Sequence, residues 1–210
     1  MLRVLAAAAA LLLAACAAPT PTLDSGWPLD SMRRSTVYLA NAKGHGSGVL
    51  IGPTTVLTAG HVAQAAGGVG GVLSVGFADG EAVSGRIVWV SETDDAALLE
   101  VAAPHKYAPA EVDCAPARWG EPLALVGNPM SDDWVLVFGA VADLDPAFDG
   151  TVMVHMPMAP GASGGPLFAT DGRVRGIAVA YQWFVVNQSQ SATGLSFMEP
   201  TSDLCDDLPS

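Results

Sequence analysis

Short apolar runs separated by turn residues recur along most of the chain. From residue 36 onward, runs rich in Val, Ile, Leu and Thr follow one another at a spacing of about 8–12 residues, which is typical of all-β proteins. No stretch of helical period is long enough to indicate alternating strands and helices. The predicted strands are Thr36–Ala40, Gly48–Ile51, Thr55–Thr58, Val72–Phe77, Arg86–Val90, Ala96–Val101, Pro122–Gly127, Val135–Val141, Thr151–Met156, Pro166–Phe168, Val174–Ala180 and Thr193–Phe197.

A polar, proline-bearing connection at Pro104–Arg118 divides these strands into two groups of six. The sequence therefore predicts an all-β fold of two six-stranded antiparallel β-barrels, the first at about residues 35–103 and the second at about residues 118–200. The length of 210 residues fits one large domain or two such lobes. The glycine cluster Gly67–Gly71 has no lysine and no helix signal after it, so we interpret it as a flexible loop and not as a phosphate-binding loop.

The N-terminal segment has a different pattern. Arg3 precedes an unbroken apolar run, Val4–Ala18, which is shorter than the roughly 18–20 residues that span a bilayer and has the shape of a secretory signal. Within the run, Leu13–Cys16 resembles the lipobox of bacterial lipoproteins. The resemblance predicts a signal peptide at residues 1–15, a lipidated Cys16 and a tether at residues 16–34. An ordinary Ala-x-Ala cleavage signal is the alternative.

The composition excludes several classes of function. Half of the residues are hydrophobic and 14% are charged, as in globular proteins. Nine Lys+Arg against 21 Asp+Glu give a formal net charge of −12, which excludes a nucleic-acid partner and disfavours electrostatic docking on anionic lipid. Membrane lipid is therefore expected as a partner only through Cys16. Because Ala17, and not aspartate, follows that cysteine, the outer membrane or the periplasmic face is favoured over the inner membrane.

Three local patterns carry candidate chemistry. Small residues surround Ser163 in the segment Pro160–Leu167, which suits a nucleophile on a tight turn because the substrate carbonyl and backbone N–H groups must come close to it. His61 follows an apolar strand at a turn, and the acidic pair Asp94 and Asp95 precedes a buried strand. Taken singly, each has a structural interpretation: a glycine-rich turn, a histidine satisfied within the fold, and the polar end of a strand.

Together, the order His61, Asp95, Ser163 and the contexts Thr-Ala-Gly-His and Gly-Ala-Ser-Gly-Gly-Pro resemble the trypsin-like (chymotrypsin-fold) serine peptidases, and most of all their compact bacterial members. The resemblance covers about residues 35–200, within a domain predicted at residues 35–205. Asp95 is preferred to Asp94 because it matches the Asp-x-Ala-Leu-Leu run of those members. The resemblance places the active site at the interface of the two barrels.

The resemblance also implies a mechanism for a serine endopeptidase acting on protein or peptide substrates. Ser163 would attack the peptide carbonyl, His61 would accept and return the proton, and Asp95 would orient the imidazole. The backbone N–H groups of Gly161 and Ser163 would form the oxyanion hole, and an acyl-enzyme would follow without a metal or organic cofactor. The four histidines, His45, His61, His105 and His155, are too scattered in the sequence to indicate a metal site.

Two positions depart from the family pattern. Ala162 stands where the animal digestive enzymes have an aspartate that pairs with a newly cut N-terminus, so activation by such cleavage is not expected. Val179 stands where many relatives have a serine that hydrogen-bonds the catalytic acid, so Asp95 needs another donor. By resemblance, the substrate pocket would be lined by Pro157, Met158, Ala159, Ala178, Val179, Ala180 and Tyr181. None of these is acidic, which favours a small or apolar substrate side chain over Arg or Lys.

Cys114 and Cys205 remain once Cys16 is assigned to lipid. In an oxidising compartment a disulfide between them is the simplest interpretation, with two free buried cysteines as the alternative. Two other functions also stay open: a trypsin-fold lipoprotein with weak or no activity that acts as a binding or regulatory module, and a structural lipoprotein of the cell envelope.

Overall fold

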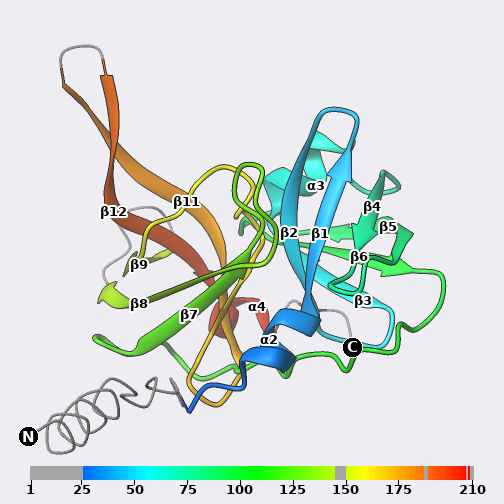
Figure 1. Cartoon of the computed structure of the whole chain (residues 1–210), viewed down its shortest axis with the longest axis horizontal. Coiled ribbons are helices and arrows are strands. Elements are labelled where there is room, and N and C mark those ends of the chain that lie inside the picture. The colour runs from blue at the N-terminus through cyan, green and yellow to red at the C-terminus, as the bar shows by residue number, and fades with distance from the viewer. Residues whose placement is uncertain (1–25, 145–149, 187–188, 207, 209–210) are drawn as a thin grey trace, which may run out of the picture.

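Two closed six-stranded antiparallel barrels lie side by side in this computed structural model, which describes residues 26–144, 150–186, 189–206 and 208 (Figure 1). The first barrel has the strand order β1-β2-β3-β6-β5-β4 and the second the order β10-β11-β12-β9-β8-β7. The strands are β1 Thr36–Asn41, β2 Gly44–Leu50, β3 Thr55–Thr58, β4 Val72–Gly76, β5 Ala82–Val90, β6 Ala97–Val101, β7 Pro122–Gly127, β8 Val135–Asp143, β9 Val152–His155, β10 Pro166–Phe168, β11 Val174–Val186 and β12 Ser189–Pro200. The predicted fold class is confirmed.

The strand bounds differ most from prediction in β2, β11 and β12. β2 begins at Gly44, ahead of the predicted Gly48, because a Gly-His-Gly-Ser run pairs with β1 although it has no strand-like composition. β11 and β12 continue well beyond their predicted ends as a hairpin that projects from the second barrel (Figure 1). Backbone pairing with the neighbouring strand defines both extensions, and the pattern of apolar residues does not indicate this pairing.

Strands at the junction of the barrels, such as β3 and β6, read as continuous apolar runs because both of their faces are buried. On β6, Leu99 fills the interior of the first barrel, whereas its neighbour Leu98 packs between the barrels. Val56 and Leu57 on β3 divide in the same way. Successive side chains of a strand point to opposite faces, so a barrel wall that also packs on a second barrel needs apolar residues at every position. This double burial fixes the two barrels against each other.

Three short helices complete the described part of the chain: α2 Leu29–Ser35, α3 Gly60–Ala65 and α4 Thr201–Leu204. Met32 of α2 is 1% exposed and belongs to the core between the barrels. Residues 29–34, which the sequence analysis assigned to the tether, are thus part of a helix that packs against the barrels. The predicted signal peptide and Cys16 lie outside the described residues.

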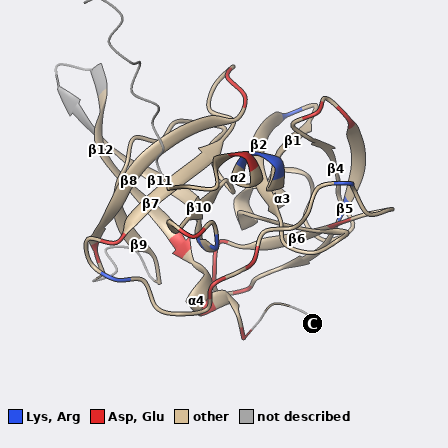
Figure 2. Ribbon diagram, turned by 60° about the horizontal axis from the view of Figure 1, so that its bottom comes forward, with Lys and Arg blue, Asp and Glu red and all other residues tan. Residues whose placement is uncertain are grey.

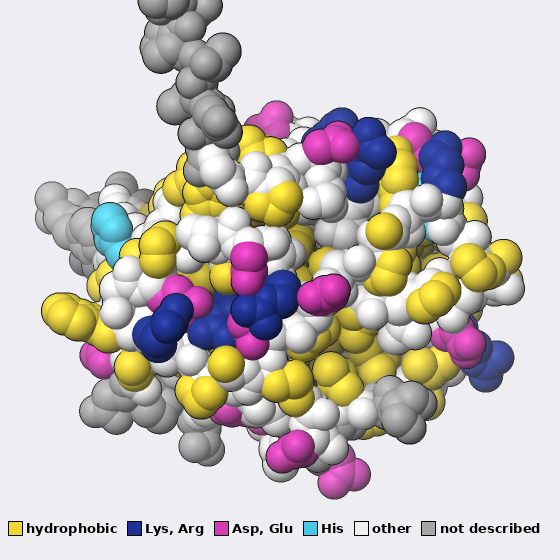
Figure 3. Space-filling model, turned by 90° about the horizontal axis from the view of Figure 1, so that it is seen from below, with side chains coloured by type: hydrophobic (Ala, Val, Ile, Leu, Met, Phe, Trp, Pro, Cys, Tyr) yellow, Lys and Arg dark blue, Asp and Glu magenta, His cyan; other side chains and the backbone are white. Residues whose placement is uncertain are grey.

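The connection between the barrels is fastened to the second barrel. Cys114 and Cys205 form a disulfide with a Cα–Cα distance of 5.8 Å, as predicted. Arg175, which is 4% exposed, makes a two-pronged ion pair with Glu121 and donates from its Nη1 to the carbonyl of Ala115 at 2.7 Å. Figure 3 shows basic and acidic side chains gathered together on the face seen from below. These contacts anchor the connection along its C-terminal part.

The basic residues of the described chain lie among acidic ones and form no separate positive face in Figure 2. For example, Arg34 pairs with Asp30 at 2.9 Å on α2. Among the described residues, no helix is long and apolar enough to cross a membrane.

Candidate active site

His61 and Asp95 meet because the strands that carry them are neighbours. β3 pairs with β6 so that Thr58, at the end of β3, lies opposite Ala97, at the start of β6. His61 follows β3 on α3, and Asp95 precedes β6. The Nδ1 of His61 lies 2.6 Å from Oδ2 of Asp95, and the backbone N–H of His61 donates to Oδ1 at 2.7 Å. Both oxygens of one carboxylate therefore hold the histidine, which leaves its Nε2 directed away from Asp95.

Gly60 allows this close approach. A Cβ at position 60 would lie 3.0 Å from Oδ1 of Asp95 and 3.2 Å from the backbone N of Ala96. Asp94, the neighbouring acid, turns to other partners: its Oδ2 accepts from the hydroxyls of Ser91 and Thr93. The geometry thus distinguishes the two acids that are adjacent in sequence.

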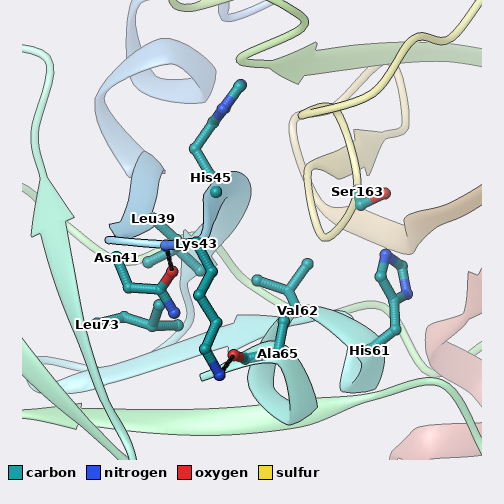
Figure 4. Close-up of a pocket in the computed structure, with 10 residues that line it drawn as sticks. Leu39, Asn41, Lys43, His45, His61, Val62, Ala65, Leu73 and Ser163 are labelled. Atoms are coloured by element: carbon teal, nitrogen blue, oxygen red, sulfur yellow. Dashed lines mark hydrogen bonds between the residues drawn. The ribbon is translucent and has the colours of Figure 1, made fainter. Parts of the chain in front are cut away.

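Ser163 comes from the other barrel, on the loop between β9 and β10. Its side chain and that of His61 line one cavity at the junction of the barrels, together with His45 and Lys43 (Figure 4). The hydrogen bonds of the described residues do not include one between Ser163 and His61. In unliganded active sites such bonds are often long and tighten only when substrate binds.

The turn before Ser163 is held so that two N–H groups remain available. The carbonyl of Pro160 accepts from the N–H of Met130 at 2.7 Å, and the carbonyl of Gly161 accepts from the hydroxyl of Ser47 at 2.8 Å. No backbone hydrogen bond among the described residues has the N–H of Gly161 or Ser163 as its donor. Such free, fixed donors suit the binding of a developing oxyanion.

Gly161 is required for this turn. Its φ of +95° is in the region that favours glycine, and a Cβ there would lie 2.3 Å from Nε2 of His45 and 2.4 Å from the carbonyl oxygen of Asn128. His45 therefore packs directly against the turn, with its Nε2 3.1 Å from the carbonyl oxygen of Asn128.

Ser47 and Asn128 form a buried polar network that the sequence analysis did not identify. The Ser47 hydroxyl accepts from the backbone N–H of Asn128 at 2.9 Å and from its Nδ2 at 3.1 Å while donating to Gly161, and the Ser47 N–H donates to the carbonyl of Ser163 at 2.8 Å. Both residues are 0% exposed. Ala162 has no carboxylate with which to brace the turn, and this network of Ser47 from the first barrel and Asn128 from the second braces it instead.

The residues expected to line the substrate pocket are divided between two places. Pro157, Met158 and Ala159 line an apolar cavity with Val135 and Val137 of β8. The residues Ala178, Val179, Ala180 and Tyr181 are not among those that line it. The side chain of Ala178 is buried in the core of the second barrel, whereas Tyr181 is 38% exposed at the base of the projecting hairpin.

Near Val179 lies a residue that the sequence analysis missed, Glu199 on β12. It is 2% exposed, and its Oε2 accepts from the backbone N–H of Asp95 at 3.4 Å. Burial raises the pKa of Glu199 to about 7. The only sequence signal was an acid in the otherwise apolar run Phe197–Pro200.

The described residues contain one group of potential metal ligands, Asp79, Glu81 and His105. Nδ1 of His105 accepts from the backbone N–H of Tyr107 at 3.2 Å, which leaves the ring proton on Nε2, facing the two carboxylates. The ammonium group of Lys106 lies 2.7 Å from Asp79, and it holds the pKa of that carboxyl at about 2. The carboxylates thus already have cationic and N–H partners, and we interpret the group as a hydrogen-bonded brace of the β4–β5 turn.

A family model described as the trypsin-like peptidase domain matches residues 46–177, and the chain belongs to this family. It is similar to the serine protease Do-like HtrA of Bacillus subtilis, with 26% identity over 178 residues, covering 77% of this chain and 38% of that protein. It is also similar to a probable periplasmic serine endoprotease, DegP-like, of Halomonas elongata, with 28% identity over 172 residues, covering 78% of this chain and 35% of that protein. The chain thus spans a little over a third of the length of these curated relatives.

Solved structures support the same fold. The serine endoprotease of Yersinia pestis superposes with a TM-score of 0.71 at 19% identity, covering 85% of this chain and 64% of that one. The inactive form of the Rv3671c protease of M. tuberculosis gives a TM-score of 0.69 at 20% identity, covering 90% of this chain and 95% of that one.

Proposed function

We propose that the protein is a serine endopeptidase in which Ser163, His61 and Asp95 form the catalytic triad. The observation that carries the proposal is the double contact of Asp95 with His61, in a cavity that Ser163 lines from the opposite barrel. Membership of the trypsin-like peptidase family supports protein substrates.

Each group then has a role that follows from its position. With its Nδ1 proton held by Asp95, His61 is in the tautomer whose free Nε2 accepts the Ser163 proton as the hydroxyl oxygen attacks the peptide carbonyl. The N–H groups of Gly161 and Ser163 stabilise the negative charge that develops on the carbonyl oxygen. His61 next gives the proton to the leaving amine, and water releases the acyl group by the same route in reverse.

The proposed substrate pocket is the apolar cavity lined by Pro157, Met158 and Ala159 together with Val135 and Val137 of β8. An apolar or small substrate side chain suits it because none of these residues is acidic. Profiling of cleavage in a peptide library tests this preference, and strong selection of Arg or Lys would contradict it.

Reaction with a fluorophosphonate probe tests the triad. The full-length protein is expected to become labelled on Ser163, and Ser163→Ala is expected to abolish labelling because the activated hydroxyl is lost. Ser84→Ala, which removes an exposed hydroxyl on β5, serves as the matched control and should label normally. Folded protein that does not react, or labelling that persists in Ser163→Ala, rules out the proposed nucleophile.

We also propose that the protein is exported and anchored to a bacterial envelope membrane through a lipid on Cys16. The disulfide between Cys114 and Cys205 supports a location outside the cytoplasm. In Cys16→Ser the chain should move from the membrane fraction to the soluble fraction and no longer incorporate labelled palmitate. Unchanged fractionation and labelling would reject the anchor.

A further inference from the structure

The side chain of Glu199, on β12, ends next to the backbone of Asp95. Its Oε2 accepts from the Asp95 N–H at 3.4 Å, and its Oε1 is buried with no hydrogen-bond partner among the described residues. A buried, half-satisfied carboxyl lowers stability and is uncommon unless it has a task. The sequence separation of 104 between Asp95 and Glu199 makes this a contact of the tertiary structure alone.

We infer that Glu199 is a positioning residue for the His61–Asp95 pair. It supports the backbone of Asp95 through a hydrogen bond, and its ionised form strengthens the binding of a proton by His61. The inference rests on the proposed function for its catalytic meaning. Glu199 lines neither the cavity of Ser163 and His61 nor the apolar cavity of Pro157–Ala159, so it acts through Asp95.

Glu199 holds Asp95 at a different point from the serine that many relatives have at position 179. Val179 offers no hydroxyl to the catalytic acid, and both oxygens of Asp95 are taken up by His61. Glu199 holds Asp95 instead through its main chain, as an acceptor. An Oε2 that is ionised accepts this N–H more strongly than one that is protonated.

The charges around Glu199 make its ionisation sensitive to the site. Burial is the largest cause of the raised pKa of Glu199, and the Asp95 N–H opposes it. Three carboxylates raise the pKa of Glu199 further: Asp94 and Asp95 from the segment before β6, and Asp203 from α4. An imidazolium ion at His61, held by Asp95, carries the opposite charge, so an ionised Glu199 favours that form through electrostatic attraction.

The titration of the His61 ring, followed by NMR in the full-length protein, tests this coupling without requiring catalysis. In the unsubstituted protein the curve should show a second inflection near pH 7, where Glu199 ionises. In the isosteric variant Glu199→Gln this inflection should vanish, and His61 should bind its proton about tenfold more weakly. Glu100→Gln, which removes one exposed charge from β6, is the matched control and should leave the curve unchanged.

Asp203→Asn provides a second variant that leaves Glu199 in place. Removing this exposed neighbouring charge should lower the pKa of Glu199 and move the second inflection of the His61 curve to lower pH. If Glu199→Gln does not fold, this shift alone decides the question. Curves for Glu199→Gln or Asp203→Asn that superimpose on that of the unsubstituted protein overturn the inference.

The pH dependence of fluorophosphonate labelling separates this inference from the proposed function. In a working peptidase, the acidic limb of the labelling rate should move to lower pH in Glu199→Gln, because less His61 is protonated there. A His61 curve that shifts in a protein that never labels would leave the Glu199 coupling intact and reject the peptidase. Normal labelling of Glu199→Gln with an unshifted acidic limb would support the peptidase and reject the Glu199 coupling.

Discussion

Replacing Asp95 by asparagine is expected to lower kcat by about 10⁴-fold while the fold is retained. The carboxylate accepts two hydrogen bonds from one residue, from the backbone N–H and the Nδ1–H of His61. An asparagine side chain has one acceptor oxygen and one donor group, so it faces at least one of these N–H groups with its own NH₂. The imidazole is then driven to the tautomer with its proton on Nε2, which cannot accept the proton of Ser163.

The measurement is the rate of hydrolysis of an ester or peptide substrate. Fluorophosphonate labelling is the second measurement, and Asp95→Asn should become labelled more slowly than the unsubstituted protein. Asp94→Asn is the matched control, since Asp94 bonds to Ser91 and Thr93 and not to His61. It should keep activity of the same order as the unsubstituted protein. A large loss in Asp94→Asn with a small one in Asp95→Asn would show that the wrong acid has been assigned.

Removing the disulfide is expected to have the largest effect on stability. In the chain-entropy model, a bridge between residues 91 apart restricts the unfolded chain by about 4–5 kcal/mol, which the double variant Cys114→Ser, Cys205→Ser would lose. The folded state should still form at low temperature, because the ion pair of Arg175 with Glu121 continues to hold the connection between the barrels.

Denaturant unfolding of the two proteins, with and without a reducing agent, measures this difference. The unsubstituted protein should lose stability when reduced and then match the double variant, whose own midpoint should not depend on the reductant. A difference below about 1 kcal/mol would mean that the bridge restricts the unfolded chain far less than its loop length indicates.

Much of the fold could be predicted because double burial leaves a direct signal in the sequence. Runs such as Thr55–Thr58 and Pro122–Gly127 were predicted with the bounds that the structure shows, since each has apolar residues on both faces and turn residues at both ends. The polar half of β2 and the projecting hairpin of β11 and β12 were missed. The extent of both is defined by pairing with a neighbouring strand, which the residues' own composition does not indicate.

The residues of the candidate site likewise divide into those that the sequence indicated and those that it did not. Ser163 and His61 stand in local contexts that glycine and small residues mark, because close approach of backbone and substrate requires them. Ser47, Asn128 and Glu199 have no such context. Each is a single polar residue within a buried strand or loop, and one polar residue does not alter an apolar pattern enough to indicate its partner.

The sequence by itself determined the two groups of six strands, the connection between them, and the order of His61, Asp95 and Ser163 along the chain. The tertiary structure alone decided that both oxygens of Asp95 hold His61, that Ser47 and Asn128 brace the turn at Gly161, and that Glu199 lies against Asp95. The reason is physical: local pattern reports which faces of a strand are buried, whereas the meeting of polar side chains far apart in sequence depends on how two closed barrels pack together.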